Sequence, residues 1–264
     1  MLPALSVTAT GLNAEQVELD AISNNLANLN TTGFKSSMPV FETLVYQQQI
    51  QPGAASSGNT LYPSGYDLGT GVRVAGTVPV LTQGNLQQTN NPLDMAIEGQ
   101  GYFQVLQPNG QIAYTRDGAF QVNQNGQLVT ADGYQVLPNV TIPPNATSVT
   151  IGQDGVISVT IPGTSNATQI GQIQLSTFVN PQGLQPVGNN LFLQTNASGA
   201  AITGNPQSNG LGGIYQGYLE QSNTNVVESM VDLISAERAY QLGTNVAADA
   251  GQSLSQLSQM ASNA

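Results

Sequence analysis

The side chains that could perform acid–base chemistry in this sequence are carboxylates, because the chain has no histidine and no cysteine. A glycosidase-type reaction needs two of them, and the central candidates are Asp94, Glu98, Asp117, Asp132 and Asp154. The last three each precede a glycine, which is typical of tight turns. Asp94 and Glu98 are four residues apart in a stretch that reads as strand and turn, where this spacing does not make them neighbours. The sequence therefore predicts no catalytic pair.

Nucleophilic and metal chemistry are equally poorly supported. A serine or threonine nucleophile needs an adjacent base, and without histidine that base would have to be Lys35. The preferred zinc ligands are absent. The glycine pairs at 69/71 and 99/101 do not continue to a third glycine or to an amphipathic helix, so they predict turns rather than nucleotide-binding loops. We expect no catalytic residue, no cofactor and no metal, and the sequence does not indicate an enzyme.

Charge is scarce, and it excludes another class of function. Only 7% of the 264 residues are charged, and the net charge is −11. The bases are Lys35, Arg73, Arg116 and Arg238, too few for a basic surface, so binding to nucleic acid is not expected. Asparagine and glutamine supply much of the polar surface instead, which suits extended contacts made through uncharged hydrogen bonds.

Membrane and targeting signals are also absent from the sequence pattern. No apolar run is long enough to predict a membrane-spanning helix, so we do not expect a membrane-embedded protein. The first thirty residues have neither a basic segment nor an unbroken apolar run of signal-peptide type. We therefore expect no cleaved signal peptide.

The middle of the chain, from Val72 to about Gly213, alternates apolar and polar residues and has turn residues at short intervals. Asparagine or aspartate followed by glycine at 109, 117, 125 and 132 predicts tight hairpins. The pattern indicates an antiparallel meander with a core of valine, isoleucine, leucine and phenylalanine. The predicted strands are 102–106, 112–115, 119–122, 127–130, 149–151, 157–160, 170–178 and 191–193.

The last forty residues, Asn225 to Ala264, contain no proline and predict one long helix. Val226, Leu233 and Tyr240 begin a seven-residue repeat that continues through Ala247 and Leu254. A second series, from Ser229 through Ala236 and Gly243, follows three positions behind it. The side chains of this seam are mostly small, so we expect the helix to be stabilised by packing against other helices.

The partner predicted from the sequence is a second helix over residues 4–29. Leu5, Leu12, Leu19 and Leu26 are spaced by seven residues, and Asn30 with the following Gly33 predicts where the helix stops. The predicted fold class is α+β: long N- and C-terminal helices pair as a coiled-coil-like unit around a central antiparallel β-rich domain. Two alternatives remain open, that the helices pack on one compact domain or that other copies of the chain cover their seams.

The side chains expected to form this seam and to pack between subunits come from both predicted helices. They are Leu5, Leu12, Leu19, Ile22, Leu26, Val226, Met230, Leu233, Tyr240, Leu254 and Leu257.

Two segments at opposite ends of the chain resemble the signatures of bacterial flagellar axial proteins, the rod and hook subunits. The N-terminal one is an asparagine-rich run that leads into Gly-Phe-Lys, and the C-terminal one runs from Gly217 to Val226 and continues to Arg-Ala-Tyr. Their order along the chain is that of the family. The matching motif residues are Asn24, Asn25, Leu26, Ala27, Asn28, Gly33, Phe34, Lys35, Arg238, Ala239 and Tyr240.

The stretch from Gln47 to Gly71 is dense in glutamine, glycine, serine and proline and reads as a long loop. It resembles the insertion that marks distal-rod subunits and that hook subunits lack, and in the family this insertion is implicated in keeping the rod straight. A flexible linker is the alternative. The residues that carry the likeness are Gln51, Pro52, Gly53, Pro63, Ser64 and Gly65.

The resemblance implies a structural subunit of the flagellar basal-body rod, most like the distal-rod members. Such a subunit self-assembles into a straight helical tube that transmits torque from motor to hook. It implies contacts with proximal rod proteins, the hook protein and surrounding ring or bushing proteins, after uncleaved export through the flagellar type III apparatus. A proximal-rod or hook subunit is the alternative within the family. Outside it, the alternative is a secreted β-rich binding module with an oligomerising coil.

The resemblance and the sequence pattern together suggest three domains. Residues 1–32 and 224–264 would form a terminal helical domain, the inner tube of the assembly. Residues 33–80 and 211–223 would form an extended or β connecting segment that includes the insertion 47–71. Residues 81–210 would form a β-rich outer domain.

Overall fold

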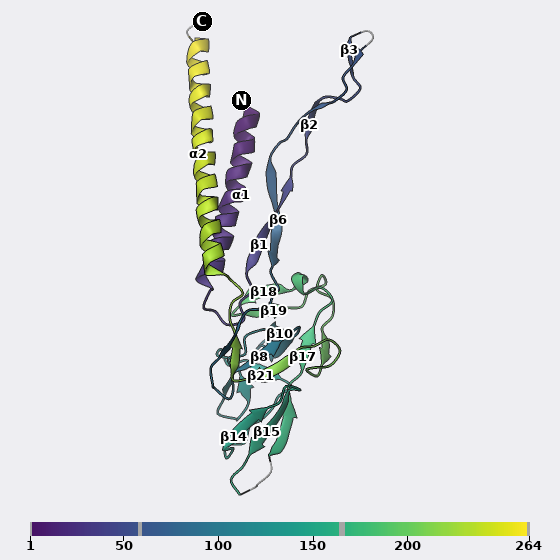
Figure 1. Ribbon diagram of the computed structural model, residues 1–264, viewed down its shortest axis with the longest axis vertical. Coiled ribbons are helices and arrows are strands. Elements are labelled where there is room, and N and C mark those ends of the chain that lie inside the picture. Colours follow the sequence, from purple (N-terminus) through teal and green to yellow (C-terminus); the bar gives the residue numbers. More distant parts are fainter. Residues whose placement is uncertain (1, 58–59, 164–166, 263–264) are drawn as a thin grey trace. The chain divides into compact units, whose positions relative to one another are not determined.

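The computed structural model describes residues 2–57, 60–163 and 167–262. Its fold class is α+β, with a β-rich central region and a long helix at the C-terminus (Figure 1). The chain divides into two compact units. The helical unit comprises residues 1–26, 37–78 and 225–264, and the β unit comprises residues 27–36 and 79–224. Both terminal helices and a strand ribbon belong to the helical unit.

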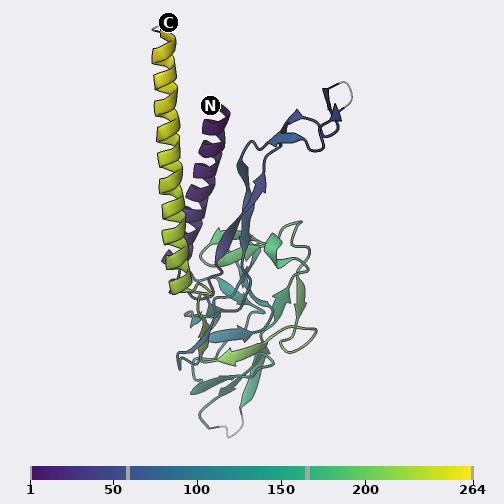
Figure 2. The same ribbon diagram turned by 45° about the horizontal axis from the view of Figure 1, so that its top comes forward.

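The two helices of the helical unit are α1 (Leu2–Ala27) and α2 (Val226–Ser262), as the heptad patterns predicted. They lie side by side and run antiparallel in both views (Figures 1 and 2). With 37 residues, α2 is roughly 55 Å long at ~1.5 Å per residue. A hydrogen bond from the Thr31 amide to the Asn28 carbonyl closes the turn after α1, and Gly33 follows with φ +67°, so the predicted helix stop is confirmed.

The seam of α2 is its least exposed stripe. Ala236 is buried, and Val226, Leu233 and Tyr240 are half-buried. A Cβ added at Gly243 would lie 2.8 Å from Cδ2 of Leu12, so a small residue is needed where α1 passes. The structure nevertheless does not show the two helices wound together as a coiled coil. Small seam residues provide little side chain to interlock with the leucines of α1.

A two-stranded antiparallel ribbon forms the rest of the helical unit. The strand pairs are β1 (Ser37–Thr43) with β6 (Val72–Pro79), β2 (Gln47–Ile50) with β5 (Tyr66–Leu68), and β3 (Ala55–Ser57) with β4 (Thr60–Leu61). About half of the stretch that reads as a loop in the sequence, residues 47–71, is thus paired strand. Antiparallel pairing satisfies backbone groups without requiring a core, so a polar sequence can adopt it. The described side chains of the ribbon are exposed or half-buried.

The β unit is built from several small sheets. Its elements are β7 (Leu86–Gln88), β8 (Met95–Glu98), β9 (Tyr102–Leu106), β10 (Ile112–Thr115), β11 (Gln121–Val122), β12 (Leu128–Val129), β13 (Gln135–Leu137), β14 (Ser148–Ile151), β15 (Val156–Thr160), β16 (Thr168–Gln172), β17 (Leu175–Thr177), the 3₁₀ turn η1 (Pro181–Gly183), β18 (Gln185–Gly188), β19 (Leu191–Leu193), β20 (Ile202–Gly204), β21 (Gly213–Gln216) and β22 (Tyr218–Glu220).

The predicted strands are present, but their order is not that of a simple meander. The nine-stranded sheet runs β11-β12-β13-β9-β10-β19-β18, with β17 and β20 off this path. Strand β10 pairs with the distant β19, with Tyr114 opposite Phe192, and not with β11, which follows it in sequence. The meander prediction was wrong at this point. Two further pairs close over long distances in sequence, β21 with β8 and β22 with β7.

The asparagine–glycine and aspartate–glycine turns explain part of this topology. Gly110, Gly126 and Gly133 have φ between 80° and 85°, as tight hairpin turns require. Gly118 differs, because its φ is not positive and a Cβ there would lie 1.5 Å from the Met95 carbonyl oxygen. The chain needs glycine at 118 for close approach to β8, and this is where the predicted hairpin is replaced by a corner.

The core of the β unit gathers fully buried side chains from β8, β9, β15, β17 and β21. Ile97, Phe103, Ile157, Leu175 and Ile214 are all completely inaccessible to solvent. The ring of Phe103 stands edge-on to that of Phe120, with 5.1 Å between centroids. Because Ile214 lies on β21, the core is complete only when residues near the C-terminal end of the unit have joined it.

Candidate functional site

Three charged side chains from distant parts of the sequence meet inside the β unit, and we call Lys35, Arg116 and Glu220 the ionic clasp. The Glu220 side chain is fully buried at the end of β22. Its Oε1 accepts a hydrogen bond from Lys35 Nζ at 2.5 Å, and its Oε2 accepts one from Arg116 Nη1 at 3.3 Å. Backbone joins in, because the Gly84 amide donates to Oε1 at 3.0 Å. One carboxylate thus ties together three chain segments.

Lys35 reaches the clasp from the segment that follows α1. Its ammonium also donates to the Thr82 carbonyl at 2.9 Å, and its side chain is only 3% exposed. Burial lowers the pKa of Lys35 from its usual value, and the neighbouring Glu220 carboxylate opposes that shift. A buried ammonium is tolerated only when it is paired, so Lys35 depends on Glu220 for its charge.

Arg116 occupies the corner between β10 and Gly118. Its Nη2 donates to the Gly99 carbonyl at 2.7 Å, and its guanidinium lies 5.3 Å from the centre of the Tyr102 ring. Among the described residues, its Nε has no hydrogen-bond partner. The clasp contains two cations and one anion, so Glu220 is the single counter-ion of both bases.

Backbone bonds hold the same segments to one another around the clasp. The Gly33 amide donates to the Glu220 carbonyl at 2.8 Å, and the Ser36 amide donates to Oδ1 of Asn223 at 2.8 Å. The Val80 amide donates to the Ser36 carbonyl at 2.7 Å. A Cβ at Gly33 would lie 2.6 Å from the Arg116 carbonyl carbon, so this glycine permits the close approach.

These segments are the ones by which the chain enters and leaves the β unit. The unit boundaries fall at 26/27, 36/37, 78/79 and 224/225, and the clasp and its backbone bonds use residues 33–36, 80–84 and 220–223. All the covalent connections of the β unit are therefore anchored to one another a few residues inside it. The clasp therefore lies beside the points at which the chain enters and leaves the β unit.

The helical unit has a smaller counterpart. Asn25, a buried residue near the end of α1, donates through Nδ2 to the Ser37 carbonyl and accepts from the Ser37 amide, both at 2.9 Å. This paired bond holds the start of β1 to the helix. It explains why asparagine, which has both a donor and an acceptor, occupies this position of the asparagine-rich motif.

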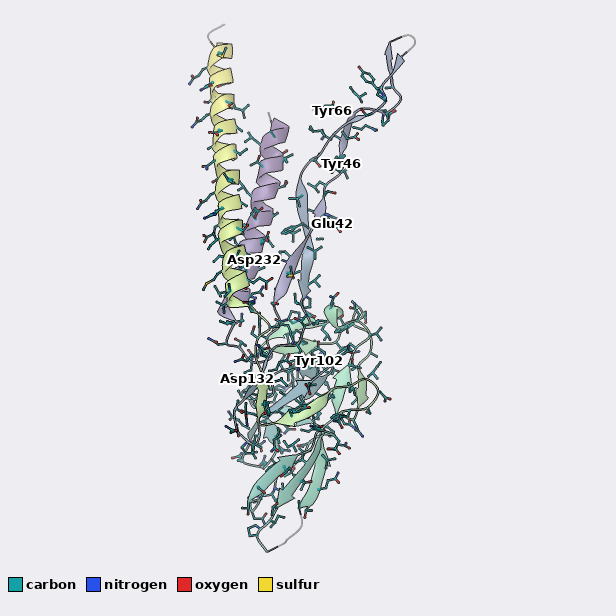
Figure 3. The ribbon with its side chains drawn as sticks, viewed as in Figure 1. Glu42, Tyr46, Tyr66, Tyr102, Asp132 and Asp232 are labelled. Atoms are coloured by element: carbon teal, nitrogen blue, oxygen red, sulfur yellow. The ribbon has the colours of Figure 1, made fainter. Side chains whose placement is uncertain are left out.

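The carboxylates considered as a catalytic pair have structural roles. Asp94 is buried and accepts hydrogen bonds from Thr89 and Asn91. Asp117 accepts from the Thr32 hydroxyl at 2.8 Å, and Asp154 accepts from the backbone of its own turn. Asp132 and Glu98 are exposed (Figure 3 labels Asp132).

Binding chemistry is equally sparse in the part of the chain that the structure covers. Within residues 2–57, 60–163 and 167–262 no group of three or more acidic, histidine or cysteine side chains could hold a metal ion. No helix there is long and apolar enough to cross a membrane.

The predicted seam residues are only partly covered within one copy. Ile22 is buried, whereas Leu5, Leu12, Leu19 and Leu26 are half-buried. On α2, Leu254 is half-buried but Met230 is 49% exposed, and the side chain of Leu257 lies outside the described part. The six residues that mark the insertion lie on the ribbon and its turns, and all are exposed except Gly65, which is half-buried. Within the second signature Arg238 is exposed, while Ala239 and Tyr240 are half-buried.

The clasp itself was not found from the sequence. In the sequence, Lys35 ends the N-terminal signature, Glu220 lies within the C-terminal one, and Arg116 is one of four basic residues. A signal is present in the sequence, because Lys35 of the N-terminal signature and Glu220 of the C-terminal one carry opposite charges in a chain with few charged residues. Neither motif predicts that Glu220, at the end of β22, lies beside the segment that follows α1.

Comparison with known proteins decides the family. Residues 5–35 match the model of flagella basal body rod proteins, residues 96–159 the D1 domain of flagellar hook protein FlgE/F/G, and residues 215–260 the C-terminal region of flagellar basal body rod FlgEFG proteins. Flagellar basal-body rod protein FlgG of Buchnera aphidicola subsp. Schizaphis graminum is 50% identical over 98% of this chain and 100% of its own length. The chain belongs to the flagellar basal-body rod protein family.

More distant relatives agree. FlgG of Borreliella burgdorferi is 44% identical over 92% of this chain and 93% of its own length. FlgG of Bacillus subtilis is 35% identical over 97% of this chain and 98% of its own length. As a member of the rod family the chain is a structural subunit of the flagellar basal body and not an enzyme, as predicted from the missing catalytic groups. One clasp residue falls in each of the three regions that match a family model.

Proposed function

We propose that this rod-family chain is a segment of the distal rod, which polymerises into a straight helical tube and carries torque from the motor towards the hook. The observation that supports self-assembly is the apolar surface left uncovered on the helical unit. Val227, Val231 and Leu242 of α2 are each more than 60% exposed. Large apolar side chains gathered in this way mark a surface that another protein covers.

In this proposal α1 and α2 form the inner layer of the tube as a coiled-coil-like pair. Their predicted seam, centred on Leu12, Leu19, Leu233 and Tyr240, is half-buried in one copy and would be covered further by neighbouring helices. Residues 81–210 form the outer layer. Residues 33–80 and 211–223 connect the layers, and the clasp anchors these connections so that torque passes through packed protein.

The distal-rod assignment, as opposed to a proximal-rod or hook subunit, depends on residues 47–71. These residues form a polar ribbon that includes the exposed Tyr66, and the exposed Tyr46 directly precedes them (Figure 3). A ribbon with unpaired edges and no core of its own is stabilised by neighbouring subunits. Wedged between them, it would resist the sliding that allows a polymer to bend.

The proposal includes the setting of the rod. The subunit would be exported uncleaved through the flagellar type III apparatus and would contact proximal rod proteins, the hook protein and ring or bushing proteins around the rod. The uncovered helix surfaces favour export before assembly, because a helical unit that is complete only in the polymer is easier to unfold alone.

Polymerisation of the purified full-length chain, followed by sedimentation and electron microscopy, tests the proposal. Leu233→Asp places an unpaired charge in the seam, where leucine burial contributes roughly 1.5 to 3 kcal/mol, and should abolish polymers while the β unit keeps its thermal transition. Gln252→Asp, at an exposed position of the same helix, is the matched control and should polymerise. Normal polymers from Leu233→Asp would show that these helices are not the inner layer.

Deleting Gln51 to Gly65 tests the distal-rod assignment separately. We expect the deletion variant to fold and polymerise into curved or flexible filaments, because the ribbon no longer reaches its neighbours. The persistence length in micrographs is the measurement, and stiff, straight filaments would leave only the general rod-family function.

A further inference from the structure

Helix α2 has a second apolar face that its own copy leaves open. At about 100° per residue, Val227, Val231, Ile234, Leu242 and Val246 fall on one stripe, about half a turn away from the seam that faces α1. We call this stripe the outer face of α2. All five side chains are exposed, from 49% at Ile234 to 72% at Val227. A helix that is apolar on two opposite sides requires partners on both.

A single cation stands in the middle of the outer face. Arg238 lies four residues after Ile234 and four before Leu242, so its side chain shares their side of the helix. It is the only basic residue in α1 or α2. It is exposed and takes part in no ion pair within the described ranges. Whatever covers the outer face must present a carboxylate to this guanidinium.

The complementary charge is present on α1 of the same chain. Glu15, Glu18 and Asp20 lie within two turns, and α1 has no base. The pKa of Glu18 is raised, first by burial and then by the like charges of Glu15 and of Asp232 on α2 (Asp232 is labelled in Figure 3). The negative charges of Glu15 and Asp232 thus act unfavourably on the Glu18 carboxylate, and a cation would relieve it.

Arg238 cannot relieve them within its own copy, because the seam of α2, and not the outer face, meets α1. Gly243 on the seam is the position where Leu12 packs. Residue 238 differs from seam positions 236 and 240 by two residues each, about 200° around the helix. A second copy of the chain is therefore the occupant that fits, with both the apolar surface and the carboxylates.

We propose that the outer face of α2 docks against α1 of a second copy, so that Arg238 of one subunit pairs with Glu18 of the next. The contact uses two different surfaces, so it is heterologous, and it propagates as an open polymer when the rotation between subunits does not close a ring. The proposal rests on the self-assembly proposed above and adds its register. The apolar side chains supply area, and the ion pair favours the alignment of the two helices that brings Arg238 to Glu18.

Charge exchange between full-length chains tests this pairing. Arg238→Glu and Glu18→Arg each place like charges across the contact, so each alone should raise the protein concentration needed for polymerisation by at least about tenfold. An equimolar mixture of the two variants should polymerise near the parent's concentration. In the mixture, the glutamate introduced at position 238 of one variant meets the arginine introduced at position 18 of the other, and the unchanged pair is also restored. Pairing within a single copy predicts no rescue by mixing.

Glu237→Gln is the matched control, since residue 237 is exposed, adjacent to Arg238 and off the outer face. It should polymerise like the parent, and circular dichroism should show unchanged helix content in all variants. If Arg238→Glu polymerises like the parent, or if the mixture is not rescued, the pairing is overturned while self-assembly stands. Failure of the parent and control to polymerise at all would instead overturn the proposed function, and this pairing with it.

Discussion

The two units of this rod-family chain treat the same kinds of residue in opposite ways. The β unit encloses most of its large apolar side chains, although Val179 and Ile202 are exposed, and it buries three charges in the clasp. The helical unit leaves valine, leucine and methionine side chains of α2 exposed, and its ion pair between Arg73 and Glu42 is at the surface, with side chains 65% and 51% exposed. The β unit therefore has its own apolar core within one copy, whereas α2 of the helical unit leaves apolar surface uncovered, as the proposed self-assembly requires.

The glycines show the same contrast. In the β unit, Gly33 and Gly118 allow backbone to approach backbone so closely that no side chain would fit. In α2, Gly251 has open space around it and Gly243 meets only the end of the Leu12 side chain. Backbone contact therefore requires glycine at these two positions of the β unit, whereas on α2 Gly251 is unconstrained and Gly243 is limited only by a side chain.

Hydrogen exchange of the monomer should show the largest difference between the units. Amides of β9 and β10 exchange through global unfolding, whose free energy is typically about 5–15 kcal/mol, while helices with uncovered faces open at much lower cost. We expect residues 102–130 to be protected by several orders of magnitude more than residues 5–26 and 226–260. Equal protection in a proven monomer would contradict the comparison, because it would show that the helical unit is stable alone.

Removing the counter-ion of the clasp should have the next largest effect. Glu220→Gln leaves Lys35 and Arg116 buried without a carboxylate, and breaking a buried pair in this way costs about 3–5 kcal/mol. Glu42→Gln, at the exposed pair with Arg73, should cost about 0–1 kcal/mol. Urea denaturation followed by tyrosine fluorescence measures both. Similar losses for the two variants would show that the clasp is not sealed from water.

Two glycine substitutions in α2 sharpen the comparison at a smaller scale. Gly251→Ala should stabilise the helix by about 1 kcal/mol, since alanine is the better helix former and nothing lies nearby. Gly243→Ala should gain less, because its Cβ would lie 2.8 Å from Cδ2 of Leu12, which must then move. Thermal melts of helix content compare them. A larger gain at 243 than at 251 would contradict the contact between α1 and α2.

The smallest effect expected is the pH response of Glu18. Its pKa is raised in the folded chain above the value of 4.5 that it has when unfolded. The helical unit is therefore most stable below that pH and loses this contribution as pH rises through the raised pKa. Glu18→Gln should remove the loss, so the variant melts slightly higher than the parent at neutral pH and equally near pH 4. A variant less stable at pH 7 would indicate a favourable partner for the carboxylate within one copy.

The family, both helices and most strands of the β unit could be predicted from residue order, although the strands within 47–71 could not. Heptad spacing identified both helices because the period of an amphipathic helix is visible in residue order. The alternation of apolar and polar residues, together with the glycine turns, predicted both ends of β9 and β10 correctly, because this two-residue period is also visible in residue order. The two terminal signatures identified the rod family because a motif of neighbouring residues can be recognised without knowledge of the fold. The missing histidine and cysteine made the absence of catalytic groups a prediction that the family confirms.

Only the tertiary structure decided which distant segments meet. Residue order does not show that β10 pairs with β19, or that Gly118 turns the chain at a corner where a hairpin was predicted. It does not show that Lys35 donates a hydrogen bond to Glu220, 185 positions away, or that Arg116 pairs with the same carboxylate. Pairings of this kind depend on which strands share a common core. Many residues from distant parts of the chain pack together to form that core, so no single stretch of sequence predicts the pairing.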